Sequence, residues 1–171
     1  MSKSVIGRRA FMATTSAAGA LVLVAGGNWV IGGNGAWAIS TKALSGAEAA
    51  MLVRMARAAY PHATLDDAIY GKVVSGLDEK ASADPALLKT LQSGAATLTE
   101  KKFDTLDDEA QAAVLTEMQA TPPFQAVRGA CITGIYNNPD VWKVLGYEGP
   151  SAELGGYINR GFSDIDWLKD A

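Results

Sequence analysis

The stretch Thr121–Tyr136 reads T-P-P-F-Q-A-V-R-G-A-C-I-T-G-I-Y. Its threonine and two prolines are typical of a helix start, because the first helical turn tolerates proline. The helix that follows is apolar nearly all round, and Gly129 and Gly134 leave room for neighbouring elements. Such a helix is expected to be buried on most sides. We therefore predict the central helix of a bundle, with its only charge, Arg128, at the surface or against an acidic partner.

Four more helices are predicted upstream, each from a start signal and an apolar stripe. Ser45 and Glu48 have the spacing of a capping box, Thr64 and Thr105 are expected N-caps, and Asp84 precedes a proline at the first helical position. No window alternates with period two for long, so we expect an all-α fold. The stripes recur every three or four residues: Leu44, Met51, Met55, Ala59; Leu65, Ile69, Val73, Leu77; Leu88, Leu91, Ala95, Leu98; Leu106, Ala110, Val114, Met118.

The remaining residues, 137–171, form a tail rich in glycine and aromatic residues. Pro139–Leu145 is expected to form one or two helical turns, but beyond it glycine and proline prevent a long regular element. Such a tail cannot build a core of its own, so its aromatic side chains need a cover. We predict an extended, partner-facing tail, because Trp and Tyr bury much area at low entropic cost. The predicted interface is Tyr136, Trp142, Tyr147, Tyr157, Phe162 and Trp167, with Arg160 as a polar anchor.

The N-terminus has the order of an export signal. A basic leader precedes an apolar run over Phe11–Ala25, and Ala36-Trp37-Ala38 is a small-x-small cleavage site, so that the mature chain begins at Ile39. We expect three parts: a signal helix within 1–38, a body of about five helices over 39–136, and the tail. A retained anchor is the alternative, since residues 11–31 have about the length of a bilayer span.

The arginine pair indicates which export pathway the signal belongs to. Arg8 and Arg9, followed after one residue by Phe11, resemble the twin-arginine (Tat) export motif. Gly7 stands where this motif usually has Ser or Thr, and Ala13 where it often has Lys. The resemblance implies passage through the Tat translocon to the periplasm, already folded and commonly with a cofactor bound. An ordinary secretory signal is the alternative.

The charge distribution argues against nucleic acid as a partner. The formal net charge is -3, and residues 1–38 hold three of the 15 basic and none of the 18 acidic side chains. The rest of the chain therefore carries 12 basic against 18 acidic residues, a net charge of -6. Binding to a phosphate backbone needs a clustered basic face, which this composition does not provide.

The sequence contains no motif that is typical of cofactor or metal binding. There is one cysteine and one histidine, whereas c-type haem, iron–sulfur clusters and zinc need several such ligands at fixed spacings. No G-x-G-x-x-G follows a predicted strand, and Gly155-Gly156 and Gly161 are interpreted as turn glycines. We therefore predict no catalytic, cofactor-binding or metal-binding residues.

His62, Cys131 and the pair Asp164 and Asp166 each allow a second, functional interpretation. His62, at a helix junction, is interpreted as a solvated or capping histidine rather than a catalytic one. Cys131 is either a small buried apolar residue or a thiol for an intermolecular disulfide. Asp164 and Asp166 have the spacing of paired carboxylates on one side of an extended segment, as a small hydrolase uses, but alternate with Ile165 and Trp167. A tail with one apolar edge and acids facing water or a basic patch explains them more simply.

The tail resembles a known family. Its run Y-N-N-P-D-V-W-K-V-L-G-Y-E-G-P-S, followed by G-G-Y and G-F-S-D-I-D-W, is similar to the gluconate 2-dehydrogenase subunit 3 family. The match extends over Gln125–Trp167, whereas Ser45–Ala120 matches only in size and helicity. Members are small subunits of periplasmic FAD-dependent dehydrogenases of the glucose-methanol-choline type.

The resemblance implies a role for a chain without a cofactor. The large subunit binds FAD and oxidises a sugar or alcohol, and it typically lacks its own signal. The small subunit aids its maturation and escorts it through the Tat translocon; a cytochrome c subunit carrying haem c is a further partner. Some relatives have an intersubunit disulfide, but Cys131 lies within a helix, so we do not expect that feature here. The alternative is a stand-alone periplasmic binding or scaffold protein.

Overall fold

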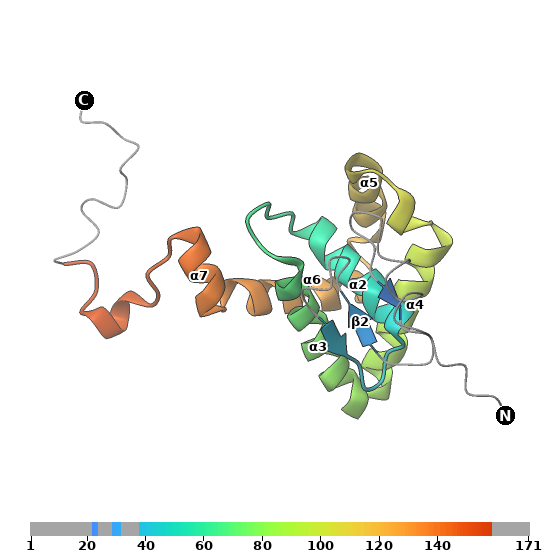
Figure 1. The fold of residues 1–171 in the computed structure, drawn as a ribbon, viewed down its shortest axis with the longest axis horizontal. Coiled ribbons are helices and arrows are strands. Elements are labelled where there is room, and N and C mark those ends of the chain that lie inside the picture. Colours follow the sequence, from blue (N-terminus) through green and yellow to red (C-terminus); the bar gives the residue numbers. More distant parts are fainter. Residues whose placement is uncertain (1–21, 24–28, 32–37, 159–171) are drawn as a thin grey trace, which may run out of the picture.

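The computed structural model describes residues 22–23, 29–31 and 38–158 (Figure 1). Most of this part of the chain is helical, so the predicted helical bundle is confirmed. The elements in chain order are α2 (Gly46–Ala59), α3 (Asp67–Ala83), α4 (Pro85–Glu100), the 3-10 helix η1 (Phe103–Thr105), α5 (Asp108–Met118), α6 (Pro122–Tyr136), α7 (Pro139–Leu145) and the 3-10 helix η2 (Ser151–Leu154).

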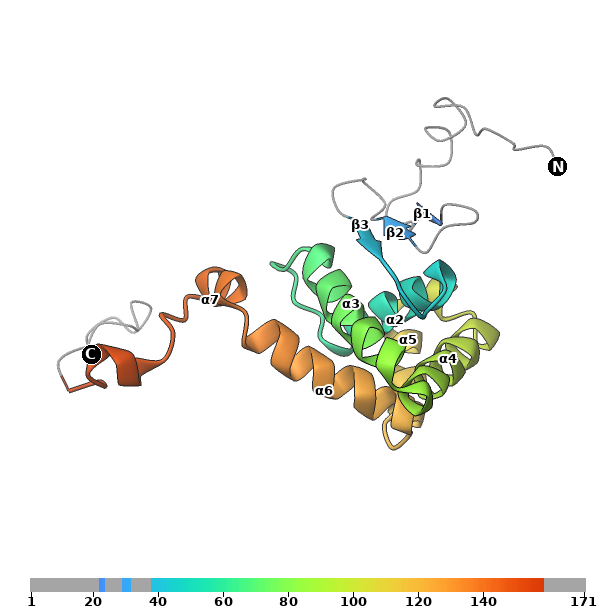
Figure 2. The same cartoon turned by 90° about the horizontal axis from the view of Figure 1, so that it is seen from below.

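Three short strands precede the helices, and the sequence did not predict them. β1 (Val22–Leu23), β2 (Trp29–Ile31) and β3 (Ala38–Ser40) form an antiparallel sheet in the order β1-β2-β3, which packs against α2 and α3 (Figure 2). We expected a signal helix here, and its described parts are strands instead. Strands of two or three residues are too short to show an alternating pattern. The rest of the predicted signal, with Arg8, Arg9, Phe11 and Ala36, lies outside the described residues; Ala38 begins β3.

The predicted helix starts are partly confirmed. Ser45 and Glu48 form the capping box, and the Asp84 carboxylate accepts hydrogen bonds from the backbone N–H groups of Ala86 and Leu87. The two expected threonine caps are wrong. Asp66 caps α3 and Asp107 caps α5.

The reason is that a nearby carboxylate suits the positive end of a helix better than a hydroxyl. The Asp66 side chain accepts from the Ala68 N–H at 2.7 Å, and the Asp107 side chain accepts from the Ala110 N–H at 2.9 Å. Thr105 instead lies in η1, where its hydroxyl donates to the Lys102 carbonyl oxygen.

The core lies between α2, α3, α4 and α6. Its largest fully buried side chains are Tyr70 and Phe103, neither of which belongs to a predicted stripe. The predicted stripes enter the core only in part, since Met51, Ile69 and Leu88 are half-buried. α2, α3 and α4 each pack against more than one helix, so the buried face of each is wider than a stripe of one residue per turn. The other buried apolar residues of the helices include Leu52, Val53, Met55, Val73, Val74, Leu77, Leu91, Ala95, Leu98, Leu115 and Met118.

α6 is not buried on most sides, contrary to the prediction. Only Val127, Cys131 and Ile135 are buried, one every four residues, and they form a single narrow stripe toward the core. Ile132 and Tyr136 on the same helix are 41% and 39% exposed. The helices at the centre of the bundle are α2, which contacts α3, α4, α5 and α6, and α3, which contacts α2, α4 and α6. The apolar outer side of α6 is thus left for another function.

Two glycines let α6 approach its neighbours closely. A Cβ atom at Gly94 of α4 would lie 2.5 Å from the Cβ of Pro123, at the start of α6. A Cβ atom at Gly134 of α6 would lie 2.8 Å from Cγ2 of Val73 in α3. Real carbon atoms do not approach to these distances, so both contacts require glycine. They hold the two ends of α6 against α4 and α3.

A buried carboxylate joins the start of the body to α3. Asp78 is 2% exposed, and its side chain accepts hydrogen bonds from the backbone N–H groups of Lys42, Ala43 and Leu44. The loop after β3 has no other partner for these three donors among the described residues. Asp78 therefore fixes the segment that enters α2, an interaction that sequence patterns do not reveal.

Gly134→Ala is expected to lower the free energy of unfolding by about 1–3 kcal/mol, the usual range for overpacking. Val73 is β-branched within a helix and cannot easily rotate away from the new methyl group. Gly129→Ala is the matched control in the same helix, because nothing lies within 4 Å of its added Cβ. This control should stabilise the protein by roughly 0.5–1 kcal/mol. Urea denaturation measures both, and equal effects would contradict the close approach.

Asp78→Ala is expected to lower the free energy of unfolding by at least about 2 kcal/mol, because it leaves three backbone donors without their acceptor. The neighbouring Glu79→Ala is the control: it removes only an exposed ion pair with Lys42 and should change stability by less than about 1 kcal/mol. Thermal or urea denaturation of the two variants decides. A similar small loss for both would show that Asp78 does not hold the loop.

Candidate interaction surface

Among residues 40–158, the exposed large apolar side chains all lie toward the C-terminal end, from Ile132 onward. From residue 40 to Gly129 no large apolar side chain is classed as exposed, whereas several are from α6 onward. Monomeric proteins rarely expose such residues together unless the patch binds something. We call this set the C-terminal apolar surface: Ile132, Tyr136, Val144, Leu145, Tyr147, Tyr157 and Ile158, which are 39–80% exposed.

The geometry of α6 and α7 presents this surface to solvent. α6 extends beyond the bundle, and α7 lies at its far end (Figures 1 and 2). The Asn138 side chain caps α7 by accepting from the Asp140 N–H, and Pro139 is its first residue. Val141 is the one residue of α7 that is buried. A helix held by so little of its own surface leaves the remainder available for a partner.

Aromatic side chains stiffen the joint between α6 and α7. The Trp142 indole N–H donates to the Tyr136 carbonyl oxygen at 2.6 Å, and the Tyr147 ring packs edge-on to Trp142 with centroids 5.3 Å apart. Gly146, in the left-handed region at φ 74°, turns the chain so that Tyr147 can donate its N–H to the Trp142 carbonyl oxygen. Part of the surface is therefore preorganised, which reduces the entropy lost on binding.

His62 ties the same joint to the body. Its Nε2 lies 2.7 Å from the Tyr136 hydroxyl, and the Tyr136 ring also packs edge-on to Tyr60. The pKa of the Tyr136 hydroxyl is raised, first by burial and then by its neighbours Tyr60 and Tyr70. His62 thus supports the end of α6, and no described side chain next to it completes a catalytic pair.

The predicted interface residues fall into two groups. Tyr136, Tyr147 and Tyr157 are exposed and Trp142 is half-buried, so four lie on or beside the surface. The others, Arg160, Phe162 and Trp167, lie outside the described residues, as do Asp164 and Asp166. The sequence missed Ile132, Val144, Leu145 and Ile158. An isoleucine in an apolar helix is ordinarily assigned to the core, and only the structure shows which side of α6 is covered.

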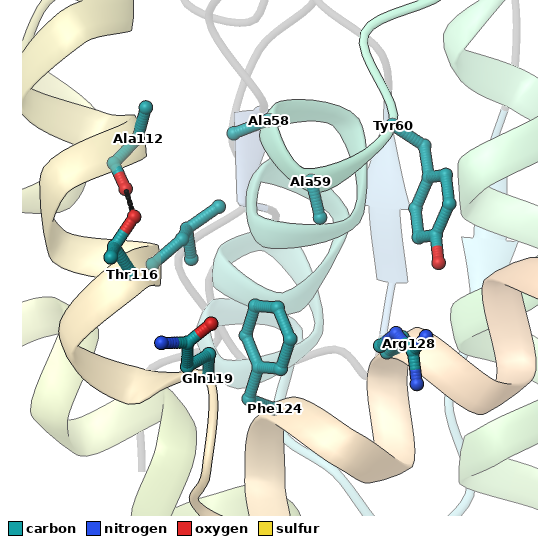
Figure 3. A pocket seen from close by; sticks show the side chains of 9 residues that line it. Ala58, Ala59, Tyr60, Ala112, Thr116, Gln119, Phe124 and Arg128 are labelled. Carbon is teal, nitrogen blue, oxygen red and sulfur yellow. Dashed lines mark hydrogen bonds between the residues drawn. The ribbon is translucent and has the colours of Figure 1, made fainter.

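A groove lies between α2, α5 and the start of α6. Figure 3 shows Phe124 and Arg128 of α6 near Tyr60 and Gln119, the residues that directly follow α2 and α5. Its volume is about 300 Å³, and it is lined by Ala58, Ala59, Tyr60, Ala112, Leu115, Thr116, Gln119, Phe124 and Arg128. None of these nine lining residues is a His, Cys, Asp or Glu.

Residues 22–23, 29–31 and 38–158 contain no group of three or more His, Cys, Asp or Glu side chains that could hold a metal ion. In the same part of the chain, no helix is both long and apolar enough to span a membrane.

Comparisons with protein-family models, with curated proteins and with solved structures found no match to this chain.

Cys131 behaves as a small apolar residue of the core. It is fully buried and unpaired, and burial raises the pKa of its thiol to about 12. Since the thiolate is the reactive form, the folded thiol is chemically inert near neutral pH. This supports the structural role of Cys131 over an intermolecular disulfide.

Iodoacetamide at pH 8 is expected to leave Cys131 unmodified in the native protein and to alkylate it fully in urea, as mass spectrometry would show.

The stability of the protein should also decrease at alkaline pH because of this thiol. The unfolded thiol ionises near its ordinary value of 9.0 but the folded thiol only near 12, so the free energy of unfolding falls as pH rises from 9. Cys131→Ala should flatten this decline. Rapid alkylation of the native protein would contradict the buried thiol.

Proposed function

We propose that this chain is the non-catalytic small subunit of a periplasmic FAD-dependent dehydrogenase of the glucose-methanol-choline type, which oxidises a sugar or alcohol. In this role it aids maturation of the flavin-bearing large subunit and escorts it through the Tat translocon. The chain itself binds no cofactor; FAD belongs to the large subunit, and a cytochrome c subunit with haem c accepts the electrons.

The observation that carries the proposal is the C-terminal apolar surface. Its exposed Ile, Val, Leu and Tyr side chains have the composition of the buried centre of a protein–protein interface, where aromatic anchors contribute most of the binding energy. The surface lies on the part of the chain, Gln125 onward, whose sequence resembles the small-subunit family. The binding role and the family resemblance thus rest on the same residues.

The division of the chain supports an escort as well. α2, α3, α4 and α6 build the core, while α7 and the residues after it contribute little to it. A folded body with a projecting binding segment can hold a partner without changing its own fold. This is what an export route for folded complexes requires of a subunit that carries the signal for both.

Removal of residues 147–171 is expected to abolish capture of the flavoprotein while the body stays folded. The body should remain folded because α7 ends at Leu145 and, among the described side chains, the core includes none after Val141. Gly149, which is also buried, lies beside Trp142 rather than in the core. Co-purification with the tagged chain measures capture, and circular dichroism measures the fold. The proposal fails if the truncated chain still retains the flavoprotein, or if the full-length chain captures none.

Point variants place the contact more sharply. Val144→Asp and Tyr147→Ala each remove an exposed apolar contact, and each is expected to weaken binding by about 30-fold or more if it lies at a hot spot of about 2 kcal/mol. Ala113→Asp, which adds the same charge on the exposed side of α5, is the matched control and should bind normally. Equal binding by all three variants would exclude this surface.

A further inference from the structure

The groove on α5 is longer than Figure 3 alone shows. A second hollow of about 490 Å³ continues it along α5, lined by Arg57, Ala58, Pro61, Ala63, Asp108, Gln111 and Ala112. The two hollows meet at Ala58 and Ala112, which line both. Together they run beside α5 from Asp108 to Gln119, about 16 Å at 1.5 Å per helical residue. An open, elongated groove of this shape suits a peptide segment better than a compact small molecule.

The two ends of the groove carry opposite charges. Arg128 lies at the α6 end and Asp108 at the start of α5, and neither forms an ion pair with another described residue. Arg57 also lines the groove, but its guanidinium already donates to the Leu65 carbonyl oxygen and lies 3.6 Å from the Asp67 carboxylate. Between the ends, five apolar residues form what we call the apolar floor: Ala58, Ala59, Ala112, Leu115 and Phe124. The polar side chains of Tyr60, Gln111 and Thr116 line the groove beside them. The groove therefore fits a segment with an acid, apolar residues and a base, in that order.

The chain itself contains such a segment. Asp164–Lys169 reads D-I-D-W-L-K, with an acid at one end and a base at the other. Extended, its ends are separated by about 17 Å, which matches the groove. Ile165 and Trp167 would then face the same side of the segment, toward the apolar floor. Charge order, length and apolar spacing all agree.

The direction of the tail favours a second copy over the same chain. α7 and η2 lie at the end of α6 that points away from α5, as both views show (Figures 1 and 2). From Ile158, only six residues lead to Asp164, a reach of about 20 Å at most. A tail that leaves its own body at the far end from the groove is suited to reach the groove of another molecule. Two copies can exchange tails reciprocally around a two-fold axis.

We propose that, without another partner, Asp164–Lys169 of one copy binds in the groove of a second copy. Asp164 pairs with Arg128, Ile165 and Trp167 cover the apolar floor, and Lys169 lies near Asp108. This goes beyond the proposed function, since it concerns the isolated chain. The exchange would cover Trp167 until a flavoprotein takes the tail, so self-association and flavoprotein binding exclude each other.

Disulfide trapping tests the contact in the full-length chain. Gln119→Cys places a thiol in the groove beside Arg128, and Ser163→Cys places one next to Asp164. The native cysteine does not interfere, because Cys131 is buried. Mild oxidation is expected to give a covalent dimer on a non-reducing gel. The control combines Ser163→Cys with Gly76→Cys, since Gly76 lies on the exposed side of α3, away from the groove. This control variant should remain monomeric. A link within one chain, or equal dimer from the control, would overturn the proposal.

Charge exchange is the second test and needs no oxidation. Light scattering of the purified chain should show a dimer whose dissociation constant rises at least tenfold with Arg128→Glu. Asp164→Arg combined with Arg128→Glu should restore it, whereas Lys89→Glu on exposed α4 should have no effect. A monomeric wild-type chain, or a dimer that ignores these changes, overturns the proposal. The Arg128→Glu variant should still capture the flavoprotein. A loss of dimerisation without a loss of capture therefore tests the tail exchange separately from the subunit role.

Discussion

The close packing of α6 against α3 and α4 is the contact on which the arrangement of this protein depends. Gly94 receives Pro123 at one end of α6, and Gly134 brings the other end onto Val73. Because both ends are held, the helix can bury a single stripe and still have a fixed direction. That direction places α7 beyond the bundle, and thereby sets where the C-terminal apolar surface lies.

The two ends of the described body are treated differently. At the N-terminal side, Asp78 takes three backbone donors of the loop before α2, so the chain is fixed from Lys42 onward. At the C-terminal side, hydrogen bonds and ring contacts around Tyr136 and Trp142 hold α7 in place, but little of it is buried. The N-terminal side of the body is thus fixed to the core, whereas α7 projects from its C-terminal side. In the proposed subunit, the export signal and the binding segment would lie at these two different ends.

Much of the helical body could be predicted from the sequence, because caps and prolines mark helix boundaries locally. The capping box at Ser45 and the proline after Asp84 are of this kind. The covered side of α6 could not be predicted, since an apolar residue such as Ile132 looks the same in sequence whether or not a neighbour covers it. Asp78 accepts from residues 34 to 36 positions away, and the groove beside Arg128 combines residues from α2, α5 and α6, so no local pattern joins either set. The tail aromatics were found because their density in a segment without periodicity is itself unusual.

We propose that this chain binds a flavoprotein rather than acting alone. The measurement that tests it most directly is the absorbance spectrum of whatever co-purifies with the tagged full-length chain from its native source. The account predicts a larger protein in constant ratio to the tagged chain, with the absorption bands of a bound flavin, since the chemistry belongs to that cofactor. A colourless preparation that contains only this chain would contradict the account.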